Sequence, residues 1–156
     1  MTTTAPDPVD HSSIRKAEQA DLLAVYRIEQ TSFPQPWPFE AFQGFLGEPG
    51  FLVATEGQKV TGYVVADCIP NHGRGLGHIK DLAVHPDRRG QGIGRRLLAR
   101  AIAALSAQNA ASVKLEVRAS NDTAKSLYQN FGFETLRTIP RYYDDGENAL
   151  VMVKSL

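Results

Sequence analysis

The most chemically informative part of the chain is a turn rich in glycine and arginine, Arg88-Arg-Gly-Gln-Gly-Ile-Gly94. Glycine lets the backbone approach a ligand closely and adopt a positive φ angle. A helix that begins at Gly92 would point the free N–H groups of its first turn, and the positive end of its dipole, at that ligand. The arginines around the turn add positive charge. The segment therefore predicts a site for a ligand that contains phosphate.

Three phosphate-binding patterns compete for this turn. A P-loop would end in Gly-Lys-Ser/Thr, which the sequence lacks. A dinucleotide fingerprint that starts at Gly90 would need Gly or Ala where Arg95 stands. The third pattern, Arg/Gln-x-x-Gly-x-Gly/Ala, is matched by Arg89, Gly92 and Gly94, after Leu-Ala-Val-His-Pro and before an amphipathic stretch. This arrangement resembles the pyrophosphate loop of the GNAT acetyltransferases.

Two further segments carry the same resemblance. Leu115-Glu-Val-Arg-Ala-Ser-Asn to Phe133 and the turn Ser32-Phe-Pro-Gln-Pro-Trp37 are similar to the ribosomal-protein-alanine N-acetyltransferases. Tyr142-Tyr-Asp-Asp-Gly-Glu-Asn to Met152 is similar to archaeal and eukaryotic N-terminal acetyltransferases. The resemblance covers about residues 14–153 and implies transfer of an acetyl group from acetyl-CoA to a primary amine, most simply a protein N-terminus. Those relatives often carry a glutamate in the loop where this chain has Gln35, so their substrate preferences do not carry over.

Two residues are expected to move protons. Glu116 lies between Leu115 and Val117 on a short strand, so its side chain should point to the opposite face from theirs. An α-amino group has a pKa of about 8, so much of it is ammonium at neutral pH and needs a base. The resemblance makes Glu116 that base, usually acting through water, and makes Tyr128 the acid that protonates the leaving thiolate. The plainer alternatives are a solvent-facing glutamate and a core tyrosine.

The resemblance also assigns binding roles. Leu82, Ala83 and Val84 should bind the pantetheine arm and the thioester through their backbone groups. Asn121 should cap a helix and also contact CoA. The acceptor would meet aromatic residues. The donor-binding residues of the turn and the strand before it are Leu82, Ala83, Val84, Arg89, Gly90, Gln91, Gly92, Ile93, Gly94 and Arg95, together with Asn121 and Tyr128; the acceptor-binding residues are Phe33, Trp37, Tyr142 and Tyr143.

The elements that must position these residues follow from periodicity and turn residues. We expect two helices, three strands, a helix, a strand, a helix and two final strands. Their expected bounds are 17–30 and 39–46, then 51–56, 60–69 and 78–85, then 92–108, 112–117, 121–130, 133–138 and 149–153, with a loop at 70–77. This order predicts a single α/β domain. The resemblance specifies a mixed, mostly antiparallel sheet with helices on both faces, splayed between the strands that end near Val84 and Val117.

Composition limits the classes of function. Seventeen basic and seventeen acidic residues balance, which argues against general binding to nucleic acid or anionic membranes. One cysteine, Cys68, and the absence of a signal-like or membrane-spanning segment suit a cytoplasmic protein. Four histidines show no metal-ligand spacing, so no metal is expected. We expect residues 1–13 to be a flexible tail and 14–156 the catalytic domain. Two alternatives stay open, an acetyltransferase of small amines and a non-catalytic acyl-CoA sensor.

Overall fold

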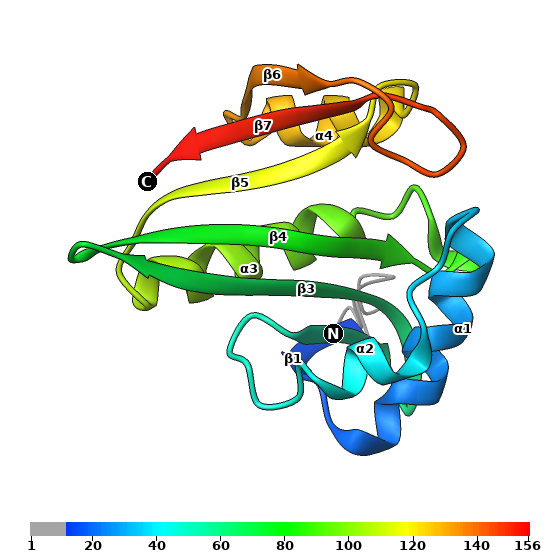
Figure 1. The fold of residues 1–156 in the computed structure, drawn as a ribbon. Helices are drawn as coiled ribbons and strands as arrows, with labels where there is room; N and C mark the ends of the chain where they lie inside the picture. The colour runs from blue at the N-terminus through cyan, green and yellow to red at the C-terminus, as the bar shows by residue number, and fades with distance from the viewer. Residues whose placement is uncertain (1–11) are drawn as a thin grey trace, which may run out of the picture.

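The computed structural model describes residues 12–156, and a seven-stranded sheet forms its centre (Figure 1). The strand order is β1-β2-β3-β4-β5-β7-β6, and only the β4–β5 pair is parallel. The strands are β1 (Ser12–Lys16), β2 (Leu52–Glu56), β3 (Lys59–Asn71), β4 (Arg74–Val84), β5 (Ala110–Arg118), β6 (Glu134–Ile139) and β7 (Ala149–Ser155). The predicted mixed, mostly antiparallel sheet is confirmed.

Helices cover both faces of the sheet, as expected. Helices α1 (Leu22–Ser32) and α2 (Phe39–Gln43) pack on one face, around buried Phe42, Phe51 and Tyr63. Helices α3 (Ile93–Ala107) and α4 (Asp122–Asn130) pack on the other. The apolar face of the predicted amphipathic helix α3 packs there: Leu97, Leu98, Ala101 and Leu105 are buried, and Ile102 is partly buried. Two short 3-10 helices, η1 (Gln19–Asp21) and η2 (Pro86–Arg88), precede α1 and the glycine turn.

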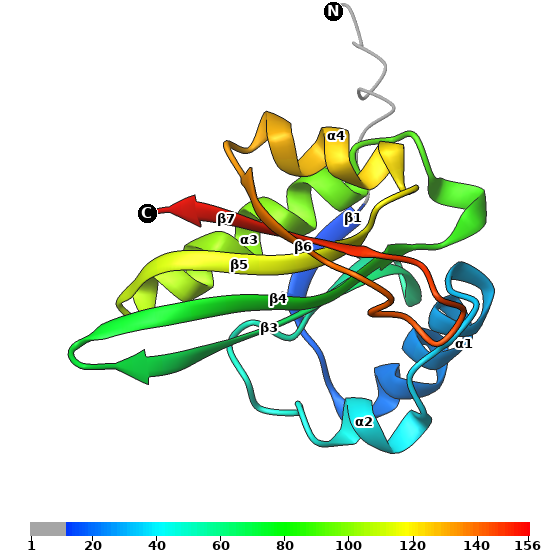
Figure 2. The same cartoon turned by 45° about the horizontal axis from the view of Figure 1, so that its top comes forward.

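The sheet splits between its two parallel strands. Strands β4 and β5 pair from Gly75 with Ala110 as far as Ile79 with Leu115, and within residues 12–156 no pairing between them continues beyond that point. Figures 1 and 2 show the two ribbons separating toward the ends of β4 and β5. The residues from Lys80 to Val84 therefore keep one backbone edge without a neighbouring strand, which confirms the expected splay. A gap of this kind between parallel strand ends is a common place for ligands.

Three parts of the fold differ from the sequence-based expectation. The segment 70–77, expected as a loop, belongs to a long hairpin in which β3 and β4 are joined at His72 and Gly73. Both turn residues have positive φ, 50° and 82°, as a tight two-residue hairpin requires. Helix α1 begins at Leu22 and not at residue 17. Strand β1 was not expected at all.

Strand β1 is a polar edge strand, which explains why its sequence pattern gives no clear signal. It pairs with β2, and the Arg15 guanidinium binds Asp21 at the start of α1 through two contacts of 2.7 and 2.9 Å. Ser12 and Ser13, assigned to the tail, therefore belong to the sheet, whereas the rest of the expected tail lies outside the described residues. No helix of residues 12–156 is long and apolar enough to cross a membrane.

Candidate active site

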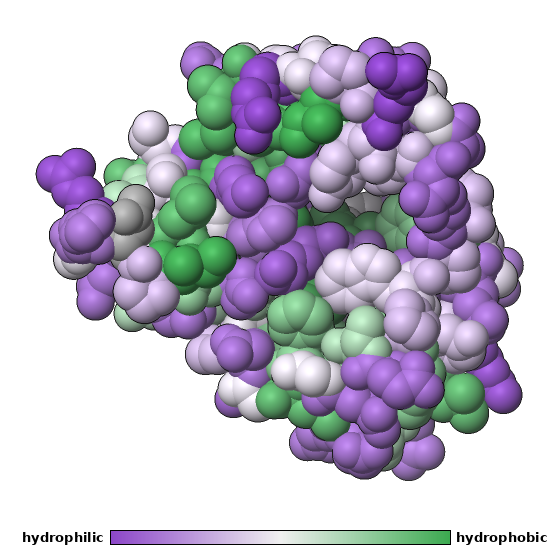
Figure 3. Space-filling view, viewed as in Figure 1, coloured by the Kyte–Doolittle hydropathy of each residue, from purple (hydrophilic) through white to green (hydrophobic). Residues whose placement is uncertain are grey.

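A pocket of about 250 Å³ lies where the sheet splits. Figure 3 shows the hollow on the face that carries the ends of β4 and β5. Its walls come from both halves of the molecule. The lining residues are Glu29, Ser32, Phe33, Pro34, Gln35 and Trp37 from α1 and the loop after it, Ile79 to Leu82 from β4, Leu115 to Arg118 from β5, and Asn121, Ala124, Tyr128 and Tyr143.

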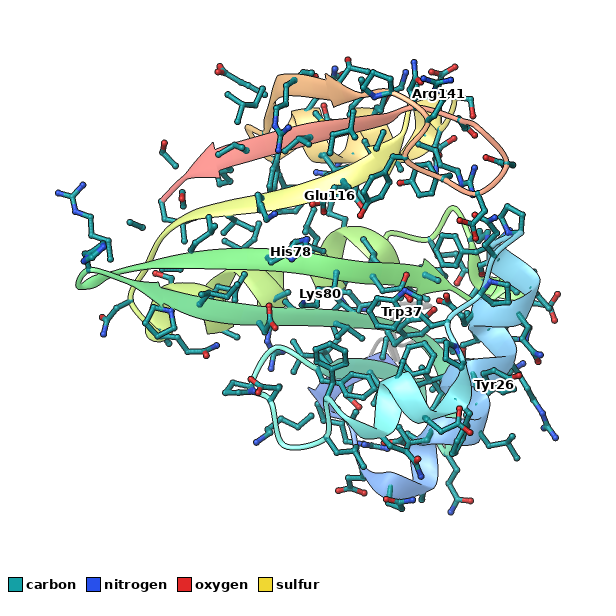
Figure 4. The ribbon with its side chains drawn as sticks, in the orientation of Figure 1. Tyr26, Trp37, His78, Lys80, Glu116 and Arg141 are labelled. Atoms are coloured by element: carbon teal, nitrogen blue, oxygen red, sulfur yellow. The ribbon has the colours of Figure 1, made fainter. Side chains whose placement is uncertain are left out.

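Glu116 points into this pocket, away from buried Leu115 and Val117, as the strand alternation predicted. Its carboxylate accepts a hydrogen bond from His78 Nε2 at 2.7 Å, and Lys114 Nζ lies 3.4 Å from its other oxygen. The His78 contact holds the pKa of Glu116 below its ordinary value, against the opposing effect of partial burial. Glu116 is therefore an ionised carboxylate at neutral pH. Figure 4 shows it beside His78.

Tyr128 comes from α4 and reaches the pocket from the side of the sheet that α3 covers. Its ring is buried and packs edge-on against Phe133 at 5.9 Å. Burial first, and then the nearby Asp81 carboxyl, raise the pKa of Tyr128, so the phenol keeps its proton at neutral pH. The structure thus brings the expected acid and the expected base to one pocket, from opposite faces of the sheet.

The glycine turn has the backbone that a ligand loop requires. Gly90 and Gly92 have φ angles of 79° and 82°, and Gly92 caps the N-terminus of α3. A Cβ atom at either position would meet no protein atom within 4 Å. Protein packing therefore does not exclude a side chain here; the backbone conformation favours glycine, and the space beside the turn is open.

The arginines of the turn are arranged differently from one another. Arg89 donates from Nε to the Val84 carbonyl at 3.1 Å and from Nη2 to the Ser32 hydroxyl at 3.1 Å, so its side chain ties the turn to β4 and α1. Arg88 is bound to Glu56 at 2.8 Å. Arg95 lies over the Phe131 ring at 5.8 Å, beside the start of α3. The side chains of Arg88 and Arg89 are thus held by protein groups.

The strand edge that should hold pantetheine is available. Leu82, Ala83 and Val84 pair with β3 on one side, while their other side faces the split. Asn121 caps α4 as predicted, because its Oδ1 accepts from the Ala124 N–H at 3.1 Å. Asn121 also lines the pocket, which places it beside the gap where the donor would enter.

The expected acceptor residues are brought together only in part. Phe33, Trp37 and Tyr143 line the pocket, with Trp37 stacked on Phe45 at 5.8 Å. Tyr142 is half exposed and lies behind Tyr143, edge-on at 5.0 Å, so it supports the lining rather than forming it. Burial raises the pKa of Tyr143 to about 12.

Sequence reasoning did not predict the hydrogen bonds that join the two acceptor loops, which are the loop after α1 (33–38) and the β6–β7 loop (140–148). We call these hydrogen bonds of Gln35 the latch. Gln35 Oε1 accepts from Arg118 Nη2 at 3.3 Å and from the Asp144 N–H at 3.2 Å. Arg118 also binds Asp145 and Glu147 at 2.8 and 2.9 Å and lies 4.0 Å over the Tyr143 ring. The loop after α1 and the β6–β7 loop therefore meet across the mouth of the pocket. Arg118 lies two residues after Glu116 on β5, so both side chains are on the same face of the strand. That spacing could have predicted that Arg118 lies in the site.

Sequence reasoning also missed three polar groups in the floor of the site. Glu29 on α1 is 1% exposed and accepts from the Trp37 N–H at 2.8 Å and from the Tyr63 hydroxyl. Asp81 on β4 lies 3.4 Å from the same hydroxyl. Glu29 follows Leu22 and Val25 at the spacing of the buried helix face, so a charge in that stripe was a visible signal.

Comparison with known proteins agrees with this geometry. Residues 22–133 match the Acetyltransferase (GNAT) family. The chain is 36% identical over 155 residues to an N-alpha-acetyltransferase of Sulfolobus acidocaldarius, with 92% of each chain covered. It is 32% identical over 145 residues to the ribosomal protein bS18-alanine N-acetyltransferase of Escherichia coli, covering 90% of this chain and 95% of the other. The structure of Ard1 from Thermoplasma volcanium superposes with a TM-score of 0.87 at 31% identity, covering 94% and 99% of the two chains.

The split sheet, the glycine turn at the start of α3 and these matches define the class: the chain belongs to the GNAT acetyltransferase family. Within that family it is an acetyl-CoA-dependent N-acetyltransferase, similar to N-alpha-acetyltransferases and to bS18-alanine N-acetyltransferases. The family and the enzyme class expected from the sequence are thereby confirmed.

Proposed function

We propose that this enzyme acetylates the N-terminal α-amino group of a protein, most simply one that begins with alanine or serine. The observation that carries the proposal is the composition of one pocket. Glu116 and Tyr128 line it together with Phe33, Trp37 and Tyr143 from the two acceptor loops. The relatives named above act on N-termini according to their names, which supports the same acceptor.

In the proposed arrangement the acetyl donor enters the split from the glycine turn. The backbone N–H groups at Gly92, Ile93 and Gly94 bind the pyrophosphate, with Gly90, Gln91 and Arg95 beside them, and Arg89 braces the turn. Leu82 to Val84 bind the pantetheine arm along the free edge of β4, and Asn121 contacts it from α4. A backbone N–H near Val84 holds the oxygen of the thioester carbonyl as it becomes negative.

The chemical step is direct attack of the amine on the thioester. The nitrogen forms a bond to the carbonyl carbon, and Glu116 takes a proton from that nitrogen through a water molecule. When the C–S bond breaks, Tyr128 gives its proton to the leaving sulfur. The raised pKa of Tyr128 keeps the phenol protonated at neutral pH, so the proton is present when the thiolate forms.

One observation favours a second candidate, acetylation of a small amine. Gln35 joins the two acceptor loops across the pocket mouth, and a mouth that is spanned in this way suits a small molecule better than a peptide chain. A non-catalytic acyl-CoA sensor is disfavoured, because such a protein has no need for Glu116 and Tyr128 in the same pocket.

The experiment is a turnover screen with acetyl-CoA. Peptides that differ only in their first residue are compared with a panel of polyamines and free amino acids, and products are located by mass spectrometry. Acetylation at the α-amino group of alanine- or serine-starting peptides is the expected result. Turnover of small amines without activity on any peptide, or acetylation of lysine side chains alone, contradicts the proposal.

A further inference from the structure

Two further carboxyl groups lie in the floor of the pocket, on the β4 side of the split, across from Glu116. Glu29 from α1 and Asp81 from β4 both line the pocket, and the Tyr63 hydroxyl stands between them. That hydroxyl has one proton and donates it to Glu29, which it approaches more closely. Asp81 keeps the weak contact with Tyr63 at 3.4 Å and accepts from the Leu82 N–H at 3.0 Å. The carboxyl of Asp81 thus adjoins the strand edge assigned to the thioester.

The two walls of the pocket differ in basicity. Burial first, and then contact with Glu29, hold the pKa of Asp81 well above its ordinary value. The neighbouring Glu29 makes ionisation of Asp81 costly, so Asp81 keeps its proton to a higher pH than an ordinary aspartate does. Glu116 is the reverse case, since His78 lowers its pKa. The other ionisable groups around Asp81 are Tyr63 on β3, Lys80 on its own strand, Arg118 on β5, Tyr128 on α4 and Tyr143 in the β6–β7 loop.

Amine acetylation needs two proton acceptors. An α-ammonium group carries three protons and the amide product carries one, so two must leave the nitrogen. The first leaves an ammonium with a pKa of about 8, which calls for a comparatively strong base. The second leaves a nitrogen that has become positively charged on forming the C–N bond. That nitrogen is far more acidic, and a weak base such as Glu116 is sufficient.

We propose that Asp81, backed by Glu29 and Tyr63, binds the acceptor's ammonium group and takes its first proton, whereas Glu116 takes the second. The first step converts R–NH₃⁺ and the Asp81 carboxylate into R–NH₂ and a carboxylic acid. The free amine then attacks, and after product release the Asp81 proton passes to water in the open pocket. The assignment rests on the proposed role of Glu116 but not on the identity of the amine.

Asp81→Asn tests the assignment, because asparagine keeps the shape of the side chain and cannot accept the proton. With the best peptide, kcat/KM at pH 7 should fall about 10²-fold or more and recover as the pH rises above the pKa of the amine, since solution then supplies free amine. Glu116→Gln should keep its deficit at alkaline pH. Glu134→Gln is the matched control: Glu134 is an exposed carboxylate on β6 that does not line the pocket, and its variant should behave as wild type.

The pH–rate profile of Glu29→Gln tests whether Glu29 raises the pKa of Asp81 or only supports the fold. Removal of the neighbouring carboxylate lowers the pKa of Asp81, so the acid limb of the pH–rate profile should shift to lower pH. Acetyl-CoA affinity, measured by calorimetry, should stay unchanged in all four variants. A pH-independent loss in Asp81→Asn, or a wild-type profile, overturns the proposal.

The role of Asp81 can be tested even if the N-terminal assignment fails or the Asp81→Asn variant does not fold. If only a small amine is turned over, the N-terminal assignment fails, and the same pH profiles with that amine still decide the role of Asp81. If Asp81→Asn does not fold, ¹³C-carboxyl NMR of the wild type decides instead. The Asp81 resonance should titrate well above the ordinary range of an aspartate and respond to a CoA–acceptor bisubstrate analogue. An ordinary titration without response to the analogue overturns the proposal.

Discussion

His78 on β4 and Glu116 on β5 meet across the last paired part of the two strands, with His78 Nε2 2.7 Å from Glu116 Oε2. The contact joins β4 to β5 at the last residues where the two strands are still paired. It therefore orients the carboxylate and lies at the end of the pocket where the split begins. Figure 4 shows the two side chains on adjacent strands, with Lys80 and Trp37 nearer α1 and α2.

His78→Ala should raise the pKa of Glu116, because the hydrogen bond from His78 is the largest cause that lowers it. ¹³C-carboxyl NMR should show the Glu116 titration at higher pH than in wild type. Turnover at pH 7 should fall less than in Glu116→Gln, since the carboxylate stays ionised. Lys114→Gln removes a smaller contribution and should move the titration in the same direction by less. An unmoved midpoint in His78→Ala would show that the contact does not form in solution.

The Asp81 carboxyl should make the protein less stable as the pH rises. The pKa of Asp81 is raised in the folded state, so the protein holds its proton more tightly than the unfolded chain does. This contribution to stability is present below the unfolded pKa and is lost as the pH rises through the folded value. The Tm of the wild type should therefore decline across that window relative to Asp81→Asn, which should be the more stable protein at pH 8. Parallel Tm curves for the two proteins contradict the raised pKa of Asp81.

Gly92→Ala should separate backbone strain from ligand binding. An alanine with φ near 82° costs about 1 kcal/mol, and its Cβ would stand in the space assigned to the pyrophosphate. Gly57→Ala is the control, because Gly57 also has a positive φ, 62°, and open space around a Cβ, but lies in the β2–β3 turn. Thermal unfolding should show similar losses of stability. Calorimetry should show at least a tenfold loss of acetyl-CoA affinity in Gly92→Ala alone.

The parts of the site that the sequence predicted are those governed by local rules. Gly90 and Gly92 are needed for positive φ, Asn121 is a standard helix cap, and Glu116 follows the alternation of a strand between buried neighbours. Each of these depends on residues within a few positions along the chain. Local pattern was enough to place them.

The parts that were missed depend on contacts between distant segments. Asp81 is brought to the α1 side by a bulge, since Val65 pairs with Asp81 and Ala66 with Ile79, which leaves Lys80 without a partner in the ladder. Simple alternation does not predict such a shift. Similarly, Gln35 and Arg118 are 83 residues apart, and only the folded chain joins them. Strand β1 was missed because an edge strand of polar residues carries no apolar period.

Tyr128→Phe should lower turnover by about 10²-fold or more at every pH, because phenylalanine has no proton for the leaving sulfur. The edge-on contact with Phe133 remains, so stability and acetyl-CoA affinity should hardly change. Tyr26→Phe, at an exposed hydroxyl on α1 that contacts only Gln30 among the bonds described, should leave turnover at the wild-type level. Near-wild-type rates in Tyr128→Phe would mean that water protonates the thiolate and that the enzyme works mainly by positioning the reactants.

Gln35→Leu should open the latch between the acceptor loops. Leucine has a similar size but lacks the oxygen that accepts from Arg118 and from the Asp144 N–H. The β6–β7 loop then loses its hydrogen bond to the loop after α1, although Arg118 still binds Asp145 and Glu147. We expect the KM for the best peptide to rise several-fold, with a smaller change in kcat, because the loops position the acceptor and do not move protons.

The same change should broaden the range of first residues, since a larger side chain can enter when the mouth is no longer spanned. The measurement is a series of kcat/KM values for peptides that begin with alanine, serine, leucine or methionine. Gln43→Leu, at an exposed position on α2, is the matched control and should keep the wild-type ranking. If Gln35→Leu keeps both the ranking and the KM, the latch is not part of acceptor selection. Selectivity would then reside in the walls formed by Phe33, Trp37 and Tyr143.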